Sequence, residues 1–446
     1  MKKLSLILRY PVSILLFALG AFLRTRELCV LSSAVLFSVT ALQAVLFYRE
    51  SRKLLDLRLW FCIAWLGAIS LTALNLSEHQ LTWIPKMWFT VGGFYFLTVA
   101  AFDIAALFLD GRELVLFKKR SEKPLPSDKM VCDRMFTALL ILFGLIMVSF
   151  LTECVVFHFE IPILSDKPHA YTEFHISGIH YLVVSTPFVH ALSVWILMKG
   201  KPGKGRKTAL LVMNILAFLI PVMILSKIQL FFELFLPFAV WFLLKKKWSR
   251  KKTFIIMGSL LAVFLAGTVA FMFLRKYPDD YLQGIFRFRK RETSLPFQYV
   301  YVYVTMNFEN LYRLMISLTR FSYGARMAFP FLWVSCLRFL PSVQPLLANE
   351  VYTVCPELNT LTLIYDAYGD FGAAGVYVFG IVLGIVLYLV TAQLKKGRAG
   401  GTLLYCQMLI YMGLSFFSTW FQTVFVWFYF GITLVVSLWC YRRKGV

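Results

Sequence analysis

Residues 365–393, YDAYGDFGAAGVYVFGIVLGIVLYLVTAQ, decide the fold class of this chain. The stretch begins with aromatic residues and two carboxylates, and after Asp370 it is apolar and carries no charge. An apolar run of about 20 residues is long enough for a helix to cross the hydrocarbon core of a bilayer. Gly372, Gly375, Gly380 and Gly384 allow a neighbouring helix to approach closely. The stretch therefore predicts a membrane-spanning helix with a polar N-terminal end.

The composition of the whole chain agrees with a membrane protein. Of its 446 residues, 59% are hydrophobic and only 15% are charged, whereas a soluble domain is nearer half apolar and a quarter charged. Eleven further apolar stretches are long enough to span a bilayer. They are Leu4–Leu23, Leu28–Phe47, Leu59–Leu76, Met87–Leu109, Met135–Phe157, Ile179–Met198, Ala209–Leu225, Ile228–Leu244, Phe254–Leu274, Leu403–Thr419 and Val424–Tyr441. The sequence thus predicts an all-α, polytopic protein with about 12 transmembrane helices.

The distribution of cations predicts the orientation of these helices. The net charge is +23, which in a soluble protein would suggest nucleic-acid binding. Most Lys and Arg residues, however, fall in alternate connections such as YRESRKLLDLR, KGKPGKGRK and KKKWSRKK, as the positive-inside rule expects. We therefore expect both termini to be cytoplasmic and no nucleic acid to be bound. The basic, apolar N-terminus lacks a convincing cleavage site and is interpreted as a retained first helix.

One long connection separates the ninth and tenth predicted spans. We divide the chain into residues 1–274 with nine spans, a large extracytoplasmic loop at 275–364, and residues 365–446 with three spans. The loop contains ten Lys and Arg against six Asp and Glu, which the positive-inside rule permits because long loops translocate regardless of charge. MNFENLYRLMISLTRF and FPFLWVSCLRFLP predict short helices that lie on, or dip into, the outer interface.

Arginine-rich parts of this loop are candidates for binding phosphate, because the planar guanidinium pairs well with phosphate oxygens. The alternatives are contact with lipid headgroups, a solvated face, and structural ion pairs with Glu309, Glu350 or Glu357. Arg313 and Arg326 share these alternatives. The predicted substrate-binding residues are Arg275, Arg287, Arg289, Arg291, Arg320, Arg338, Lys227, Asn359 and Tyr365.

Four acidic or imidazole groups are candidates for proton transfer: Asp366, Asp370, His180 and Glu233. Asp366 and Asp370 are four residues apart and share a helical face, so one could stay ionised while the other holds a proton. Helix capping and interfacial anchoring are the alternative. Glu233 follows Lys227 by about a turn and a half, so the two could pair. His180 could be a base or a structural donor.

The remaining motifs are absent or ambiguous. The eight cysteines form no CxxC and no Cys/His cluster, so we predict no metal site and no cofactor. Cys336 and Cys355 both fall in the loop, where a disulfide and two free thiols are both open alternatives. Phosphate-binding GxxxxGK[ST], HExxH and GxSxG sequences do not occur.

The order of these features resembles the Wzy-type oligosaccharide repeat-unit polymerases of bacterial O-antigen and capsule assembly. The resemblance covers about a dozen spans and a large outer loop before the last few. Its most specific residues are Asn359-Thr360 and a following YxDFGxxG, here Tyr368 to Gly375; Gly178-Ile179-His180-Tyr181 is a weaker match, and Lys227 stands where such proteins often have Arg.

This resemblance implies a function in the bacterial cytoplasmic membrane. Similar proteins join undecaprenyl-pyrophosphate-linked sugar units on the outer leaflet, by metal-independent inverting glycosyl transfer. The implied partners are the lipid-linked oligosaccharide, membrane lipid, a chain-length regulator and a flippase. The alternatives are a lipid-linked oligosaccharide flippase or exporter, an O-antigen ligase, and a membrane protein with a structural or regulatory role in an envelope complex.

Overall fold

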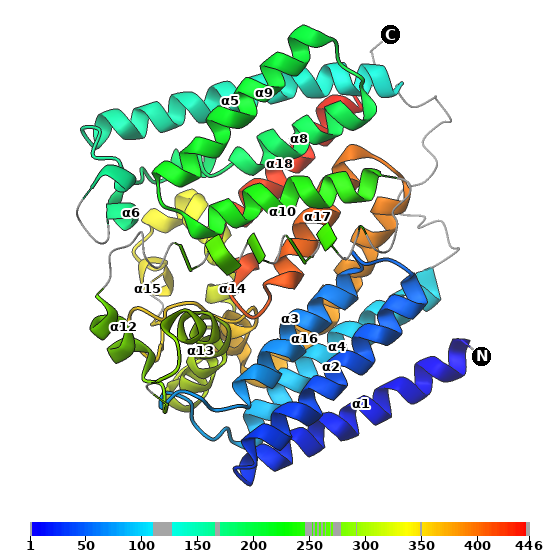
Figure 1. The fold of residues 1–446 in the computed structure, drawn as a ribbon, viewed down its shortest axis with the longest axis vertical. Coiled ribbons are helices and arrows are strands. Elements are labelled where there is room, and N and C mark those ends of the chain that lie inside the picture. The colour runs from blue at the N-terminus through cyan, green and yellow to red at the C-terminus, as the bar shows by residue number, and fades with distance from the viewer. Residues whose placement is uncertain are drawn as a thin grey trace. The chain divides into compact units, whose positions relative to one another are not determined.

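The computed structural model describes residues 2–109, 127–165, 170–245, 278–290, 292–347 and 350–442, with short stretches between 252 and 270. These residues form α-helices and short 3-10 helices (Figure 1). Two of them, Ser77 and Phe288, also pair in an isolated antiparallel β-bridge. The helices group into two compact units that cut across the chain order. The domains predicted from the sequence, which end at residues 274 and 364, are instead consecutive segments of the chain.

Unit 1 combines the N-terminal helices with Pro278–Ala392 and Tyr411–Trp427. Its N-terminal helices are α1 (Lys2–Thr25), α2 (Cys29–Ser51), α3 (Leu57–Thr72) and α4 (Pro85–Leu109). Its later helices are α12 (Asp279–Phe286), α13 (Leu295–Ser317), α14 (Ala325–Val334), η3 (Cys336–Phe339), α15 (Gln344–Leu347), most of α16 (Tyr365–Lys395) and η4 (Trp420–Gln422). Helices α1 to α4 lie side by side, and α13 packs on α3 (Figure 1).

Unit 2 contains the helices from the middle of the chain together with Gln393–Ile410 and the C-terminal part from Phe428. Its helices are α5 (Asp128–Val156), η2 (Pro162–Leu164), α6 (Ala170–Glu173), α7 (His180–Val183), α8 (Thr186–Lys199), α9 (Lys204–Met223) and α10 (Lys227–Leu244). Most of α17 (Ala399–Gly413) and of α18 (Val424–Cys440) belongs to it as well. Helix α8 is central, because it packs on α5, α9 and α10.

Seven described helical segments are long and apolar enough to cross a membrane. They are Cys29–Ser51, Pro85–Leu109, Asp128–Val156, His180–Lys199, Lys204–Met223, Lys227–Leu244 and Tyr365–Lys395. Three more apolar helices are shorter, Leu57–Thr72, Ala325–Val334 and Val424–Cys440. The chain is therefore a helical membrane protein, as its composition predicts.

Some predicted boundaries differ from the structure for local reasons. The predicted span Ile179–Met198 corresponds to the candidate membrane segment His180–Lys199, but a turn at Val184 and Ser185 divides this segment into α7 and α8. The turn lies there because Pro187 has no N–H to continue a helical ladder. The predicted span Leu403–Thr419 is helical only to Gly413 and is followed by a 3-10 turn. The predicted span Phe254–Leu274 lies largely outside the described residues. Cys336 and Cys355 are free thiols.

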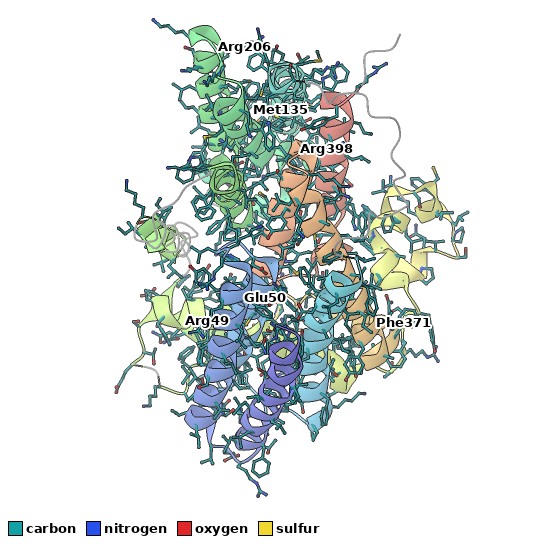
Figure 2. The ribbon with its side chains drawn as sticks, turned by 90° about the vertical axis from the view of Figure 1, so that its right-hand side faces the viewer. Arg49, Glu50, Met135, Arg206, Phe371 and Arg398 are labelled. Carbon is teal, nitrogen blue, oxygen red and sulfur yellow. The ribbon has the colours of Figure 1, made fainter. Side chains whose placement is uncertain are left out.

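A network of four buried charges and the exposed Glu50 ties together four helices of unit 1. Asp103 on α4 accepts hydrogen bonds from Arg9 of α1 and, at 2.7 Å, from Arg58 of α3. Glu50, labelled at the end of α2 in Figure 2, lies 3.2 and 3.3 Å from the same two arginines. Asp56 caps α3 through the Arg58 backbone N–H and pairs with its guanidinium. Buried charges need such partners, because an unpaired charge is costly away from water.

Candidate functional site

The polar pocket of unit 1 lies where the α3–α4 connection meets the end of α12. Ser77 pairs with Phe288, the Ser77 hydroxyl donates to the Phe286 carbonyl, and Glu78 N–H donates to the Arg287 carbonyl at 2.8 Å. Arg287 itself ends α12 with a left-handed backbone, φ +43°. A non-glycine residue in this region costs about 1–2 kcal/mol. The strain persists because these hydrogen bonds fix the turn.

The pocket has a volume of about 460 Å³. Its lining is Glu78, Asp280, Gln283, Gly284, Arg287, Phe288 and Gln298. Gln298 is buried, and its amide donates to the Thr293 carbonyl. Two carboxylates, two amides and one guanidinium provide donors and acceptors around one hollow. This mixture suits a ligand with many hydroxyl groups, because each sugar hydroxyl both donates and accepts.

The other predicted arginines of this region have different surroundings. Arg289 is exposed, and its guanidinium donates to the Asn75 carbonyl at 3.0 Å, so it fixes the connection that forms the pocket wall. Arg320 is exposed, and Arg338 lies over the Phe339 ring. Arg275 and Arg291 lie outside the described residues.

Glu309 of α13 is a buried carboxylate beneath the α3–α4 connection. It accepts hydrogen bonds from the Leu81 backbone at 3.2 Å and the Trp83 indole at 2.9 Å. Burial raises its pKa from 4.5 to about 7, although those hydrogen bonds and the charges of Arg24 and Arg313 oppose the shift. The acid is therefore far more easily protonated in the folded protein than in the unfolded chain.

This shift predicts a pH dependence of stability. Between pH 4.5 and about 7 the folded chain holds more protons at Glu309 than the unfolded chain does, so stability falls as pH rises through this window. The shift corresponds to roughly 3 kcal/mol. Glu309→Gln removes this fall while keeping the shape of the side chain. Burial lowers the pKa of nearby His79, so the contribution of His79 to stability rises with pH, opposite to that of Glu309. Thermal unfolding of both proteins from pH 4.5 to 8 is the measurement, and parallel curves would contradict it.

The YGDFG sequence at 368–372 holds the loop helix α14 against α16. Helix α16 is interrupted at Phe371 and Gly372, whose φ is +62°. The interruption leaves the carbonyls of Gly369 and Asp370 free to accept hydrogen bonds from the Ser322 and Tyr323 backbone, at 3.1 and 3.2 Å. Glycine is needed at 372 for this backbone.

Asp370 is buried and caps α14. Its two carboxylate oxygens accept hydrogen bonds from the Arg326 and Met327 backbone N–H groups, at 3.0 and 2.8 Å. These are two of the N–H groups that the first turn of a helix leaves unpaired. The capping alternative thus has clear geometric support, although the cap serves α14 and not the helix that carries Asp370.

Asp366, one turn before Asp370, lies beside the buried Arg326. Its carboxylate is 3.7 Å from the Arg326 guanidinium and interacts with the Thr419 hydroxyl. Arg326 also donates to the Ser322 hydroxyl at 3.0 Å and the Glu350 carbonyl at 2.9 Å. A Cβ atom at Gly369 would lie 2.5 Å from Arg326 Cδ, so only glycine leaves room for this side chain. The Asp366 side chain keeps 14% exposure and is the more accessible carboxylate of the pair.

Tyr365 and the asparagines of α13 hold the segment before α16. The Tyr365 hydroxyl accepts from Tyr352 N–H at 2.7 Å and donates to its carbonyl. Asn310 donates to the Leu358 and Thr360 carbonyls and accepts from Val354 N–H. Asn359, between two of these anchor points, is exposed. Tyr365 is thus a buried anchor in this structure, whereas Asn359 is open to a ligand.

In unit 2, His180 is held by a carboxylate that is not among the predicted site residues. Glu153 of α5 is fully buried, and its two oxygens lie 3.0 and 3.1 Å from His180 Nδ1. Glu153 also accepts from Ile176 N–H. With Nδ1–H donating to Glu153, the other ring nitrogen can accept a proton, the arrangement of an oriented general base. The signal in the sequence is a lone glutamate within an apolar span, FLTECVVF.

Glu233 pairs with histidine and lies deeper in unit 2. Its carboxylate is 2.5 Å from His190 Nε2, and His190 Nδ1 is 2.5 Å from the Asn214 side-chain oxygen. The Glu233 side chain has no exposed surface. Lys227, the predicted partner, begins α10 directly after the N-cap residue Ser226. Among the described residues, no three His, Cys, Asp or Glu side chains are grouped to hold a metal ion.

The structure therefore gathers the predicted residues into separate groups. Asp366, Asp370 and Tyr365 lie around Arg326 in unit 1, and Arg287 and Arg289 flank the polar pocket of the same unit. His180 and Glu233 belong to unit 2 and have separate partners. Comparison with family models, curated proteins and solved structures found no match to the chain. The fold and these groups define a polytopic helical membrane protein with a folded, arginine-bearing segment outside its candidate spans.

Proposed function

We propose that this protein polymerises lipid-pyrophosphate-linked oligosaccharide repeat units, as a multi-pass protein of the bacterial cytoplasmic membrane. In this proposal the segment from Pro278 to Ile364 lies on the outer side, both termini are cytoplasmic, and about twelve helices cross the membrane. The polar pocket is the observation that carries the proposal. A hydrogen-bonding hollow of about 460 Å³, in the same compact unit as the candidate membrane helices α2, α4 and α16, suits the sugar part of a lipid-linked glycan.

The pocket charges favour a sugar over a pyrophosphate at Arg287. Two carboxylates, Glu78 and Asp280, line the pocket with a single guanidinium, so an anion as charged as pyrophosphate would be repelled there. Arg287 instead donates to sugar oxygens. Arg320 and Arg338 remain the described loop arginines proposed to meet the pyrophosphate.

The proposed reaction is an inverting glycosyl transfer. An acceptor hydroxyl loses its proton to a base, and its oxygen attacks the anomeric carbon of the donor sugar. The bond from that carbon to the pyrophosphate oxygen breaks, and the electron pair leaves with the pyrophosphate, where arginine stabilises the developing charge. Asp366 and His180 are the two predicted proton acceptors with accessible side chains, whereas Asp370 and Glu233 are buried. Glu153 orients His180.

Arg287→Ala tests the proposed glycan contact. We expect chain extension to fall roughly tenfold or more, because a hydrogen bond from a charged group contributes about 1.5–3 kcal/mol. Purified protein is incubated with a lipid-pyrophosphate oligosaccharide and no nucleotide, and the products are resolved on a gel. Lys290→Ala is the matched control, because this exposed cation is close in sequence and does not line the pocket. Full-length ladders from Arg287→Ala would show that the pocket does not bind the glycan during chain extension.

A flippase or exporter is the second candidate, and one observation favours it. Buried charges lie within the helices of both units, at Asp103 with Arg9 and Arg58 and at Glu233 with His190. Ionisable groups inside membrane helices often line a transport path. The same incubation with vesicles separates the two functions: new glycosidic bonds indicate a polymerase, and movement of the glycan lipid across the bilayer without new bonds indicates a flippase.

A further inference from the structure

An apolar groove lies in unit 1 between α1, α4 and α16, apart from the polar pocket. Its volume is about 530 Å³. Its lining is Ile14, Phe17, Ala18, Ala21, Phe22, Thr25, Pro85, Trp88, Phe89, Gly92, Gly93, Phe96, Leu97 and Tyr377. Phe22 and Phe89 are more than half exposed, so the groove is open on one side. Helices α4 and α16 are candidate membrane spans, which places this opening toward lipid.

Two glycines shape the floor of this groove. A Cβ atom on Gly92 would lie 2.6 Å from a Phe17 ring carbon, and one on Gly93 would lie 2.6 Å from a Tyr377 ring carbon. The absence of side chains at these positions lets both rings approach the α4 backbone closely. The groove is therefore built into the packing of three helices.

The length of the groove matches one leaflet of a bilayer. From Ile14 to Thr25 along α1 the rise is about 16 Å, and from Pro85 to Leu97 along α4 it is about 18 Å. One leaflet contributes about 15 Å of hydrocarbon, half of a core of about 30 Å. The C-terminal end of α1 meets the N-terminal side of α4, since Arg24 donates to the Leu81 carbonyl. Thr25 and Pro85 thus mark the same end of the groove.

Two exposed cations, Arg26 and Lys86, come directly after the lining residues Thr25 and Pro85 in the sequence, at this end of the groove. Arg26 lies over the Phe22 ring at 5.2 Å, and Lys86 lies over the Tyr368 ring at 5.6 Å. Neither cation has an acidic partner within ion-pair distance in the described structure. Cations at the level of the headgroups attract anionic lipid.

We propose that this groove binds one acyl chain of an anionic phospholipid, whose phosphate is held by Arg26 and Lys86. The apolar walls contact the acyl chain, and the two cations favour an anionic headgroup over a zwitterionic one. The inference rests on the membrane-spanning fold and does not depend on the proposed glycan chemistry.

Native mass spectrometry of the purified full chain tests the proposal, with phosphatidylglycerol, phosphatidylcholine and a polyprenyl phosphate offered separately. We expect phosphatidylglycerol to be retained about tenfold better than phosphatidylcholine. Ala18→Trp fills the groove and should abolish retention, whereas Leu15→Trp, on the same helix outside the lining, should not. Arg26→Gln with Lys86→Gln should make the two phospholipids equal. Arg52→Gln with Lys53→Gln is the control for total charge.

Several results would overturn the assignment. Equal retention of the two phospholipids by the wild-type chain removes the headgroup selectivity. Retention of polyprenyl phosphate but not of phosphatidylglycerol shows that the groove binds a different lipid. A loss with Leu15→Trp as large as with Ala18→Trp shows that the effect is not specific to the groove. None of these results depends on chain extension, so a failure here is distinct from a failure of the proposed polymerase.

Discussion

Asp103→Ala will destabilise the protein by roughly 3–5 kcal/mol, the usual cost of removing one partner from a buried ion pair. Arg9 and Arg58 are both buried and both bound to this carboxylate, so the substitution leaves two guanidiniums short of an acceptor. Glu50 cannot compensate fully, because its side chain is 41% exposed and lies at the edge of the network. Helices α1, α3 and α4 lose their common polar contact.

Thermal unfolding in detergent measures this effect, with Asp133→Ala as the matched control. Asp133 pairs with Arg206 on the surface, where both side chains are about half exposed. An exposed pair of this kind contributes about 0–1 kcal/mol. A second variant, Asp103→Ala with Arg9→Leu, should recover part of the loss by removing one unpaired charge. Equal, small shifts for Asp103→Ala and Asp133→Ala would show that the network contributes little.

Much of the helical content was predictable, because an apolar run of bilayer length is a local signal. The predicted span Met87–Leu109 matches α4 at Pro85–Leu109, and the predicted loop helix matches the later part of α13. The pairing of helices was not predictable. Most of these helices carry apolar residues on all faces, so the sequence does not show which face packs against which neighbour. The contacts of Glu309 with the α3–α4 connection join residues more than 200 positions apart.

The candidate site was predictable as a set of residues and not as a set of partners. Glu309, Glu350 and Glu357 are the partners that the sequence suggests for Arg326, but the structure places Asp366 and the Glu350 carbonyl beside it. The reason is the interruption of α16 at Gly372, a backbone feature that spacing does not reveal. The pairing of Asp103 with Arg9 and Arg58 is likewise a contact that its place near the end of the predicted span Met87–Leu109 does not indicate.

Asp370→Ala will destabilise the segment around α14 by roughly 2–6 kcal/mol. The two backbone N–H groups that its carboxylate satisfies would be left without partners, and each unsatisfied buried donor costs about 1–3 kcal/mol. Asp370→Asn should have a smaller effect, because its oxygen can still accept one of the two hydrogen bonds. Limited proteolysis between residues 318 and 347, read together with global thermal unfolding, separates local release of α14 from loss of the whole fold.

The same variants distinguish a structural role of Asp370 from a chemical one. If the carboxylate acts through α14, cleavage of the 318–347 segment and loss of chain extension increase together from Asp370→Asn to Asp370→Ala. Asp279→Ala is the matched control, an exposed carboxylate in the first turn of α12 whose removal should cost only about 0.3–1 kcal/mol. If Asp370→Asn abolishes chain extension while proteolysis and unfolding stay as in the wild type, Asp370 takes part in proton transfer and the capping explanation is wrong. The geometry favours the first outcome, because both carboxylate oxygens are already bound to backbone N–H groups.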